Sequence, residues 1–207
     1  MPATLKAKDV NELKKAPRVE GVLDVFLDRW SPRSFADRDV SPALLRKVFE
    51  AARWAASSYN EQPWRFILGR RGDNTWQKIF DTFSDFNKKW TRTAPVLMIN
   101  AAKPRFDHNG SPNRVALYDL GAATQCLCLE ATALGLATHQ MAGFDTEAAR
   151  KAFGIPEDYT IGAAIALGYQ GEPDALDEQM LQSEVAPRTR LPLDQFVLSE
   201  WGTAADL

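Results

Sequence analysis

The sequence predicts an α+β fold, because its helical and strand-like segments do not alternate regularly. Helical patterns dominate the first part of the chain, and a long apolar helix is expected at 114–137, with β-prone segments scattered between the helices. A doubly wound fold would require regular strand–helix–strand units, which this order does not give. The 207 residues, 45% of them hydrophobic, suffice for one core.

Three parts of the chain are expected from its composition. Residues 1–20 are polar and charged, which predicts a surface arm. Residues 21–192 hold the recognisable elements and form the one expected domain, and residues 193–207 form a tail. The stretch from Glu172 onward contains three prolines and few apolar pairs, so we expect an extended arm that rests on another surface.

Two helices are predicted before the first strand. Residues 21–30 place apolar side chains at helical spacing. Residues 41–56, "SPALLRKVFEAARWAA", begin with Ser41 as a plausible N-cap and Pro42 at the first helical position, and they carry one apolar stripe.

The middle of the chain predicts two strands around an aromatic helix. "RFILGRR" (65–71) and "APVLMINAA" (94–102) are short and β-prone, and 103–114 reads as a polar loop. Between them, residues 73–90 carry aromatic side chains three or four positions apart, which predicts one helix. That stripe either packs into the core or lines a pocket for a flat ligand.

The last predicted elements follow the long helix at 114–137. The helix ends at a break, "THQMAGF" (138–144), and Asp145 then reads as the N-cap of a short helix that stops at Gly154. "YTIGAAIALGY" (159–169), rich in small and β-branched residues, predicts a central strand.

Composition argues against several classes of protein. A net charge of −2 with interleaved acids and bases does not favour a nucleic-acid surface. The longest apolar run, 115–138, contains Asp119 and Glu130 and so predicts a buried helix and not a membrane span. The N-terminus lacks the apolar stretch of a secretory signal, so we expect a cytoplasmic protein.

The sequence also favours no metal site and no glycine-loop nucleotide site. Cys126 and Cys128 lie two apart on the long helix and are expected to be small core residues, and two histidines are too few for zinc. Neither G-x-G-x-x-G nor G-x-x-x-x-G-K-[ST] occurs, and G-x-S-x-G is absent. No catalytic nucleophile or carboxylate pair stands out.

Three polar clusters lie at the ends of predicted elements: "RWSPRSF" (29–35), "SSYNEQPWRF" (57–66) and "PRTRLP" (187–192). Taken singly, an arginine pair on a loop is more often a solvated charge than a binding site. Together the clusters supply guanidinium, hydroxyl and amide groups suited to a phosphate or a polar ring edge. These groups belong to Arg29, Ser31, Arg33, Ser57, Ser58, Asn60, Arg188 and Arg190.

In this order the clusters resemble the motifs of the FMN-dependent nitroreductase family: R-x-S-x-[RK]-x-[FY], S-S-x-N-x-Q-P-W-x-F and [KR]-x-R-x-P. "YDLGAATQCLCLEATALGLATHQMAGFD" (118–145) is similar to the family's central helix and following loop. The resemblance covers about residues 22–192. It implies a mostly antiparallel central sheet flanked by helices, and a homodimer whose exchanged arms enclose two FMN molecules.

The resemblance also implies roles for particular residues. Ser57, Ser58 and Asn60 match residues that reach the flavin from the partner subunit. The backbone at Ala142 and Gly143 falls where the family contacts flavin N5 and O4, although some members carry a glutamate at the position of Ala142. The implied FMN-binding set is Arg29, Trp30, Ser31, Arg33, Ser57, Ser58, Asn60, Met141, Ala142, Gly143, Arg188 and Arg190.

Arg33 matches the basic position at the pyrimidine edge of the flavin. A guanidinium there stabilises the negative charge that two-electron reduction leaves near N1 and O2. The alternative is a surface ion pair with Asp37 or Asp39. Asp119 is either near the site or a helix-surface charge, and Asn87 is a weaker candidate.

The implied activity is ping-pong hydride transfer from NAD(P)H through flavin N5 to a nitroaromatic, a quinone or a similar acceptor. The aromatic stripe and the loop at 103–113 are candidates for the rim that selects the acceptor. The same scaffold also hosts dehalogenases, flavin-consuming enzymes and dehydrogenases. A flavin-binding protein without turnover is a further alternative.

Overall fold

A four-stranded antiparallel sheet forms the centre of the molecule in the computed structural model, which describes residues 5–207. The strands follow the order β1-β2-β4-β3, and every neighbouring pair is antiparallel. They are β1 (Trp64–Arg70), β2 (Val96–Ala102), β3 (Ala137–Met141) and β4 (Thr160–Gly168). The predicted α+β fold with a mostly antiparallel sheet is confirmed, and β4 is central as expected.

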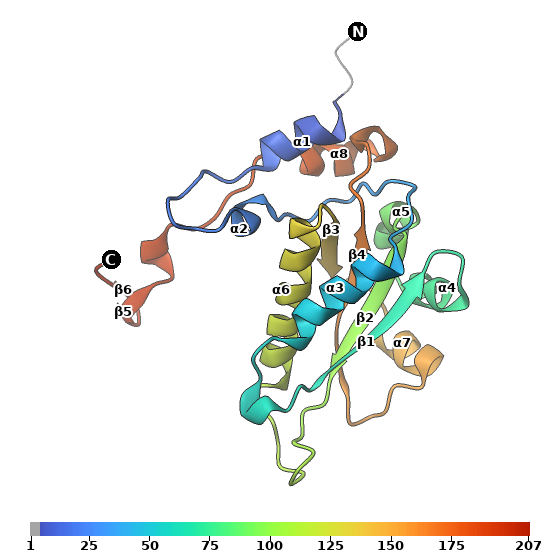
Figure 1. The fold of residues 1–207 in the computed structure, drawn as a ribbon, viewed down its shortest axis with the longest axis vertical. Helices are drawn as coiled ribbons and strands as arrows, with labels where there is room; N and C mark the ends of the chain where they lie inside the picture. The colour runs from blue at the N-terminus through green and yellow to red at the C-terminus, as the bar shows by residue number, and fades with distance from the viewer. Residues whose placement is uncertain (1–4) are drawn as a thin grey trace.

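Helices cover both faces of the sheet (Figure 1). All seven residues of β2 are buried, and alternate side chains enter opposite core layers. Val96 and Met98 pack in one cluster, whereas Leu97 and Ile99 pack in the other. The first layer holds α3 (Pro42–Arg53) and α6 (Ala116–Ala133), and the second holds α4 (Asn74–Asp81), α5 (Asp85–Thr91) and α7 (Thr146–Phe153).

Local capping signals place two of these helices where they were predicted. The Ser41 side chain accepts a hydrogen bond from the backbone of Leu44 at the start of α3. Asp145 does the same for Ala148 at the start of α7. α7 ends at Gly154, whose φ of 60° is the left-handed conformation that glycine adopts without a steric cost.

Three element predictions were wrong. Residues 73–90 form two helices, because Ser84 caps α5 and Phe83 makes an isolated bridge with Phe144. The supposed break after α6 begins with strand β3, which pairs with β4. At 21–30 only the short helix α2 (Asp24–Asp28) forms.

The two terminal segments contain helices that the sequence analysis missed. α1 (Ala7–Lys14) and α8 (Glu178–Val185) lie side by side beyond one end of the sheet (Figure 1). Val10 is fully buried and Met180 nearly so, so neither segment is simply a polar or extended arm. Residues 1–4 of the predicted N-terminal arm lie outside the described residues.

The last part of the chain leaves the body. The hairpin of β5 (Leu198–Glu200) and β6 (Thr203–Ala204) projects away from the sheet (Figure 1), and Trp201 is 99% exposed. Among the helices in 5–207, none combines the length and the apolar character of a membrane span.

Candidate functional site

The arginine loop, residues 29–34, is held at its base by strand β3 and by the segment that follows β4. The carbonyl of Ser34 accepts a hydrogen bond from the backbone of Gly171 at 2.9 Å, and the Ser34 hydroxyl donates to the carbonyl of Glu172. His139 on β3 donates from Nδ1 to the carbonyl of Pro32 at 3.0 Å, because a carbonyl can only accept. The loop is therefore fixed although it has no regular structure.

Positive charge gathers around this loop. Arg29 donates to the Ser31 hydroxyl at 3.3 Å, and burial lowers the pKa of Arg29, with Arg190 lowering it further. Burial, Arg190 and Arg29 together lower the pKa of Arg188. Within residues 5–207, none of the arginine cluster, Arg29, Arg33, Arg188 and Arg190, has a carboxylate within ion-pair distance.

Two of these guanidinium groups also hold unsatisfied donors. The Nε atoms of Arg33 and Arg188 are buried and, in the described chain, have no hydrogen-bond partner. The proposed surface pair of Arg33 with Asp37 or Asp39 is wrong, because Arg71 contacts both of those carboxylates. Buried donors and unpaired charge are costly unless an anion or acceptor meets them, so this cluster fits the phosphate and polar ring edge of FMN.

The two C-terminal arginines, Arg188 and Arg190, differ in the hydrogen bonds that they already make. Arg188 donates from Nη1 to the carbonyls of Lys14 and Leu27, which ties it to the ends of α1 and α2. Arg190 is exposed and donates only to the carbonyl of Thr189 in the described chain. Arg190 is thus the freer of the two to close on a ligand.

Trp30 points to α1. Its indole Nε1 donates to Asn11 at 2.9 Å, and the ammonium of Lys14 lies 5.1 Å from the ring centroid. A cavity of about 250 Å³ borders Trp30 and Arg29 and reaches Thr132 at the end of α6. Trp30 therefore anchors the arginine loop to the N-terminal helix.

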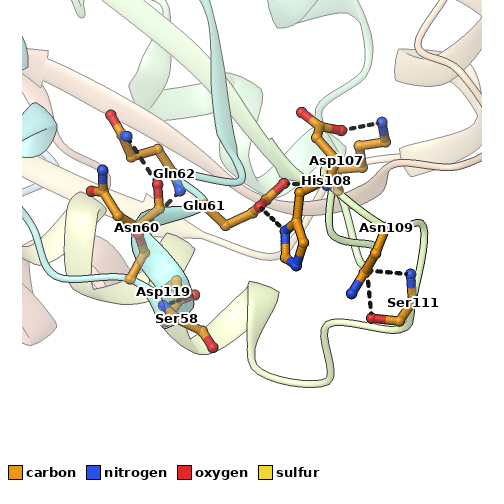
Figure 2. Close-up of polar contacts among 11 residues, drawn as sticks. Ser58, Asn60, Glu61, Gln62, Asp107, His108, Asn109, Ser111 and Asp119 are labelled. Carbon is orange, nitrogen blue, oxygen red and sulfur yellow. Dashed lines mark hydrogen bonds and ion pairs between the residues drawn. The ribbon is translucent and has the colours of Figure 1, made fainter.

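The motif loop, residues 57–62, is fixed to the first turn of α6. The backbone of Ser58 donates to the carboxylate of Asp119 at 3.1 Å (Figure 2). Asp119 is only 3% exposed, so the alternative of a helix-surface charge is wrong. Tyr59, Asn60 and Gln62 have φ between 50° and 55°, a conformation that costs about 1–3 kcal/mol each.

The other side of the motif loop is fixed to the polar loop at 103–114. One carboxylate oxygen of Glu61 accepts from the backbone of Asp107 at 2.6 Å, and the other lies 3.8 Å from His108 Nδ1 (Figure 2). Tyr59, 85% exposed, packs edge-on against Phe106. The contacts confirm that 103–114 is a loop and place it beside the motif loop.

The motif loop and the arginine loop lie at opposite ends of α6 in one chain (Figure 1). Asp119 contacts the first, and Thr132 borders the cavity beside the second. At 1.5 Å per residue, the helix rises about 20 Å between them. One chain therefore does not bring Ser57, Ser58 and Asn60 together with the arginine cluster.

The side chain of Asn87 holds the backbone of the segment 141–143 in place. Met141 is buried, whereas Ala142 and Gly143 are exposed. The carbonyl of Gly143 accepts from the side-chain amide of Asn87 at 2.9 Å and from the backbone of Ser84 at 3.0 Å. A Cβ at position 143 would lie 2.6 Å from the nitrogen of that amide, so a side chain there would displace the amide of Asn87.

The aromatic stripe belongs mainly to the core. Trp76, Phe83 and Trp90 are at most 7% exposed and pack in one cluster, which confirms the core alternative for them. Phe86 differs, since it is 43% exposed and its ring lies 6.0 Å from the guanidinium of Arg33. Only Phe86 keeps the alternative role of lining a pocket.

Sequence reasoning missed two titratable residues at the arginine loop. Burial lowers the pKa of His139 to about 4, and the nearby charges of Arg33 and Arg29 lower it further. Burial raises the pKa of Glu184, although hydrogen bonds from Ser34 and Arg33 oppose that rise. Both act across more than 100 positions of sequence, so no local pattern could have revealed them.

Comparison with known proteins places this geometry in a family. The model of the nitroreductase family matches residues 27–169. An uncharacterized 15.4 kDa protein of Mycolicibacterium smegmatis is 36% identical over 146 residues, 67% of this chain and 97% of that protein. An NADH dehydrogenase of Thermus thermophilus is 28% identical over 204 residues, 83% of this chain and 92% of its own length.

A solved structure agrees over nearly the whole chain. It is described as an oxidoreductase containing FMN, and it superposes with a TM-score of 0.85 at 28% identity. The match covers 93% of this chain and 97% of that protein.

Proposed function

Because the chain belongs to the nitroreductase family, we propose that it is an FMN-dependent oxidoreductase that oxidises NADH or NADPH and reduces a small acceptor such as a nitroaromatic or a quinone. The observation that carries the proposal is the arginine cluster, in which the buried Nε donors of Arg33 and Arg188 have no partner among residues 5–207. The FMN of the similar oxidoreductase structure and the name of the Thermus thermophilus relative support it.

Different residues of the chain would bind different parts of the FMN. Arg29, Ser31, Arg188 and Arg190 would bind the phosphate and ribityl end, because charge-assisted bonds from guanidinium groups suit phosphate oxygens. Arg33 would face the polar edge of the ring. The exposed backbone at 142–143 would meet the ring near N5, with Met141 contributing only main chain and Trp30 acting through the loop it anchors.

When bound, FMN would supply the redox chemistry, which is hydride transfer from the nicotinamide to the acceptor through flavin N5. The protein contributes position and electrostatics. Arg33 would place a fixed positive charge where reduction leaves negative charge on the flavin, which would favour the reduced cofactor. The loop at 103–114 with exposed Tyr59 is our candidate for the rim that selects the acceptor.

We also propose that the active form is a homodimer with exchanged arms. Large apolar side chains are exposed on α6, at Leu117 and Tyr118, and on the tail, at Phe196 and Trp201. Two α6 helices packed antiparallel across a twofold axis would bring the motif loop of one chain to the arginine loop of the other. Ser57, Ser58 and Asn60 would then reach the flavin from the partner subunit.

The test is a visible spectrum of the purified protein, repeated after FMN is added, followed by anaerobic reduction with each nicotinamide and reoxidation by nitroaromatics and quinones. We expect bound-flavin absorbance and faster NAD(P)H oxidation when an acceptor is present. Arg29→Gln with Arg190→Gln should lower FMN affinity at least tenfold, whereas exposed Arg46→Gln should not. A protein that binds no FMN would overturn the proposal.

A further inference from the structure

We infer that Glu184, in the C-terminal helix α8, is a positioning residue that fixes Arg33 for the bound cofactor. The inference rests on the proposed function and concerns a residue outside the family match at 27–169. α8 reaches back over the arginine loop from more than 140 positions away in the sequence.

The carboxylate of Glu184 grips the backbone of the loop. Its two oxygens accept from the N–H of Arg33 at 2.9 and 3.1 Å, and one of them also accepts from the N–H of Ser34 at 3.2 Å. Glu184 is 1% exposed, so water cannot replace these acceptors. Loss of the carboxylate would leave two backbone donors unsatisfied at the base of the Arg33 side chain.

The same carboxylate leaves the guanidinium of Arg33 free. In the described chain, no ion pair joins Glu184 to that group, and its Nε keeps no partner. An arginine that formed an ion pair with a buried glutamate would lose much of its attraction for a ligand. Here Glu184 binds the main chain of the loop. It therefore orients the side chain of Arg33 without forming an ion pair with its guanidinium group.

Lys14 of α1 holds the helix that carries Glu184. Its ammonium group donates to the carbonyls of Ser183 at 3.0 Å and Ala186 at 2.5 Å, at the C-terminal end of α8. Lys14 is only 7% exposed, and a cation suits the negative end of the helix dipole. A continuous set of contacts therefore runs from the N-terminal helix through Lys14 and Glu184 to Arg33.

The experiment compares three variants with the wild-type protein. Glu184→Ala removes both acceptors, Glu184→Gln keeps one oxygen in nearly the same volume, and Glu178→Gln removes an exposed charge from the same helix as a control. Each variant is assayed for its affinity for oxidised FMN and for the reduction potential of the bound flavin. Amide hydrogen exchange at Arg33 and Ser34 is measured without FMN.

We expect Glu184→Ala to weaken binding of reduced FMN about tenfold more than binding of oxidised FMN, which lowers the two-electron potential by about 30 mV. A purely structural role would weaken both forms equally. Exchange at the two amides should rise at least tenfold in the same variant. Glu184→Gln should recover most of the potential and of the protection, and Glu178→Gln should match the wild type.

The inference is overturned if the flavin bound to Glu184→Ala has an unchanged reduction potential. It is also overturned if Glu184→Gln lowers that potential and the amide protection as much as Glu184→Ala does. If Glu184→Ala does not fold, Glu184→Gln and Lys14→Met carry the test, because a folded Lys14→Met with wild-type exchange at Arg33 contradicts the contact path. A wild-type protein that binds no FMN overturns the proposed function instead, while the exchange data still decide whether Glu184 holds the loop.

Discussion

The sheet-and-helix body and the C-terminal tail differ in how far they bury their apolar residues. Every residue of β2 is buried between two helical layers, whereas every residue of β5 is exposed and Trp201 is 99% exposed. The core of the body is buried within one chain. The tail presents apolar side chains that only a further surface can cover, and it follows directly after Arg188 and Arg190 of the arginine cluster.

The largest expected effect is in the body. Ile99→Ala should lower the free energy of unfolding by about 2–5 kcal/mol, since it opens a cavity in a packed core layer. Urea denaturation should give this loss at every protein concentration. Trp201→Ala, by comparison, should lower stability only where the wild-type chain is associated, and an equal loss at all concentrations would break the distinction.

Removal of residues 191–207 should affect assembly and cofactor binding more than folding. We expect the shortened chain to keep its far-UV circular dichroism but to become monomeric, with FMN affinity reduced about 100-fold, or about 2.7 kcal/mol. Light scattering after size exclusion and FMN titration check both effects. A shortened chain that remains a dimer with full FMN affinity would show that the tail is dispensable.

His139 should make the body sensitive to acid. Its pKa is lowered from 6.5 to about 4 in the folded state, so the folded protein binds the proton less tightly than the unfolded chain. The stabilisation is present above pH 6.5 and is lost as the pH falls toward 4, by about 2 kcal/mol between pH 7 and pH 5.

The direct test of this pH effect is His139→Gln. The substitution should flatten the difference between the unfolding free energies at pH 7 and pH 5. A difference of about 2 kcal/mol that persists in His139→Gln would contradict the assignment.

The smallest expected effect is at the motif loop. Asp119→Asn keeps an oxygen for the backbone of Ser58 but removes its charge, which should cost about 1 kcal/mol of stability. FMN affinity should fall severalfold, because Ser58 lies in the loop that we propose reaches the flavin of the partner subunit. Thermal melts and FMN titration check this, and Asp119→Ala should cause a larger loss in both measurements.

Much of the body could be predicted because its signals are local. Ser41 with Pro42 and Asp145 with Gly154 mark helix ends within a few residues, and β2 is apolar at every position except Asn100. β3 was missed because its five residues include Thr138, His139 and Gln140, which resemble a loop when their pairing with β4 is unknown. The break between α4 and α5 depends on a tertiary bridge to Phe144.

The candidate site could likewise be predicted only in part. The arginine and motif loops could be recognised from short patterns, but those patterns do not tell that the loops lie at opposite ends of α6. Glu184, His139 and Asn87 have no local signature, because their roles arise from hydrogen bonds to distant backbone. The structure therefore mainly adds the residues that hold the loops in place, because the candidate binding residues on the loops could already be recognised from the sequence.

The central claim, a flavin site built from two chains, is tested most directly by mixing two defective variants. One chain carries Arg29→Gln with Arg33→Gln, and the other carries Ser58→Ala with Asn60→Ala; each binds FMN poorly alone. After subunit exchange, the account predicts mixed dimers with one intact site and one doubly altered site, so FMN binding returns to about one flavin per mixed dimer. Mixed dimers that bind no more FMN than either variant alone would contradict it.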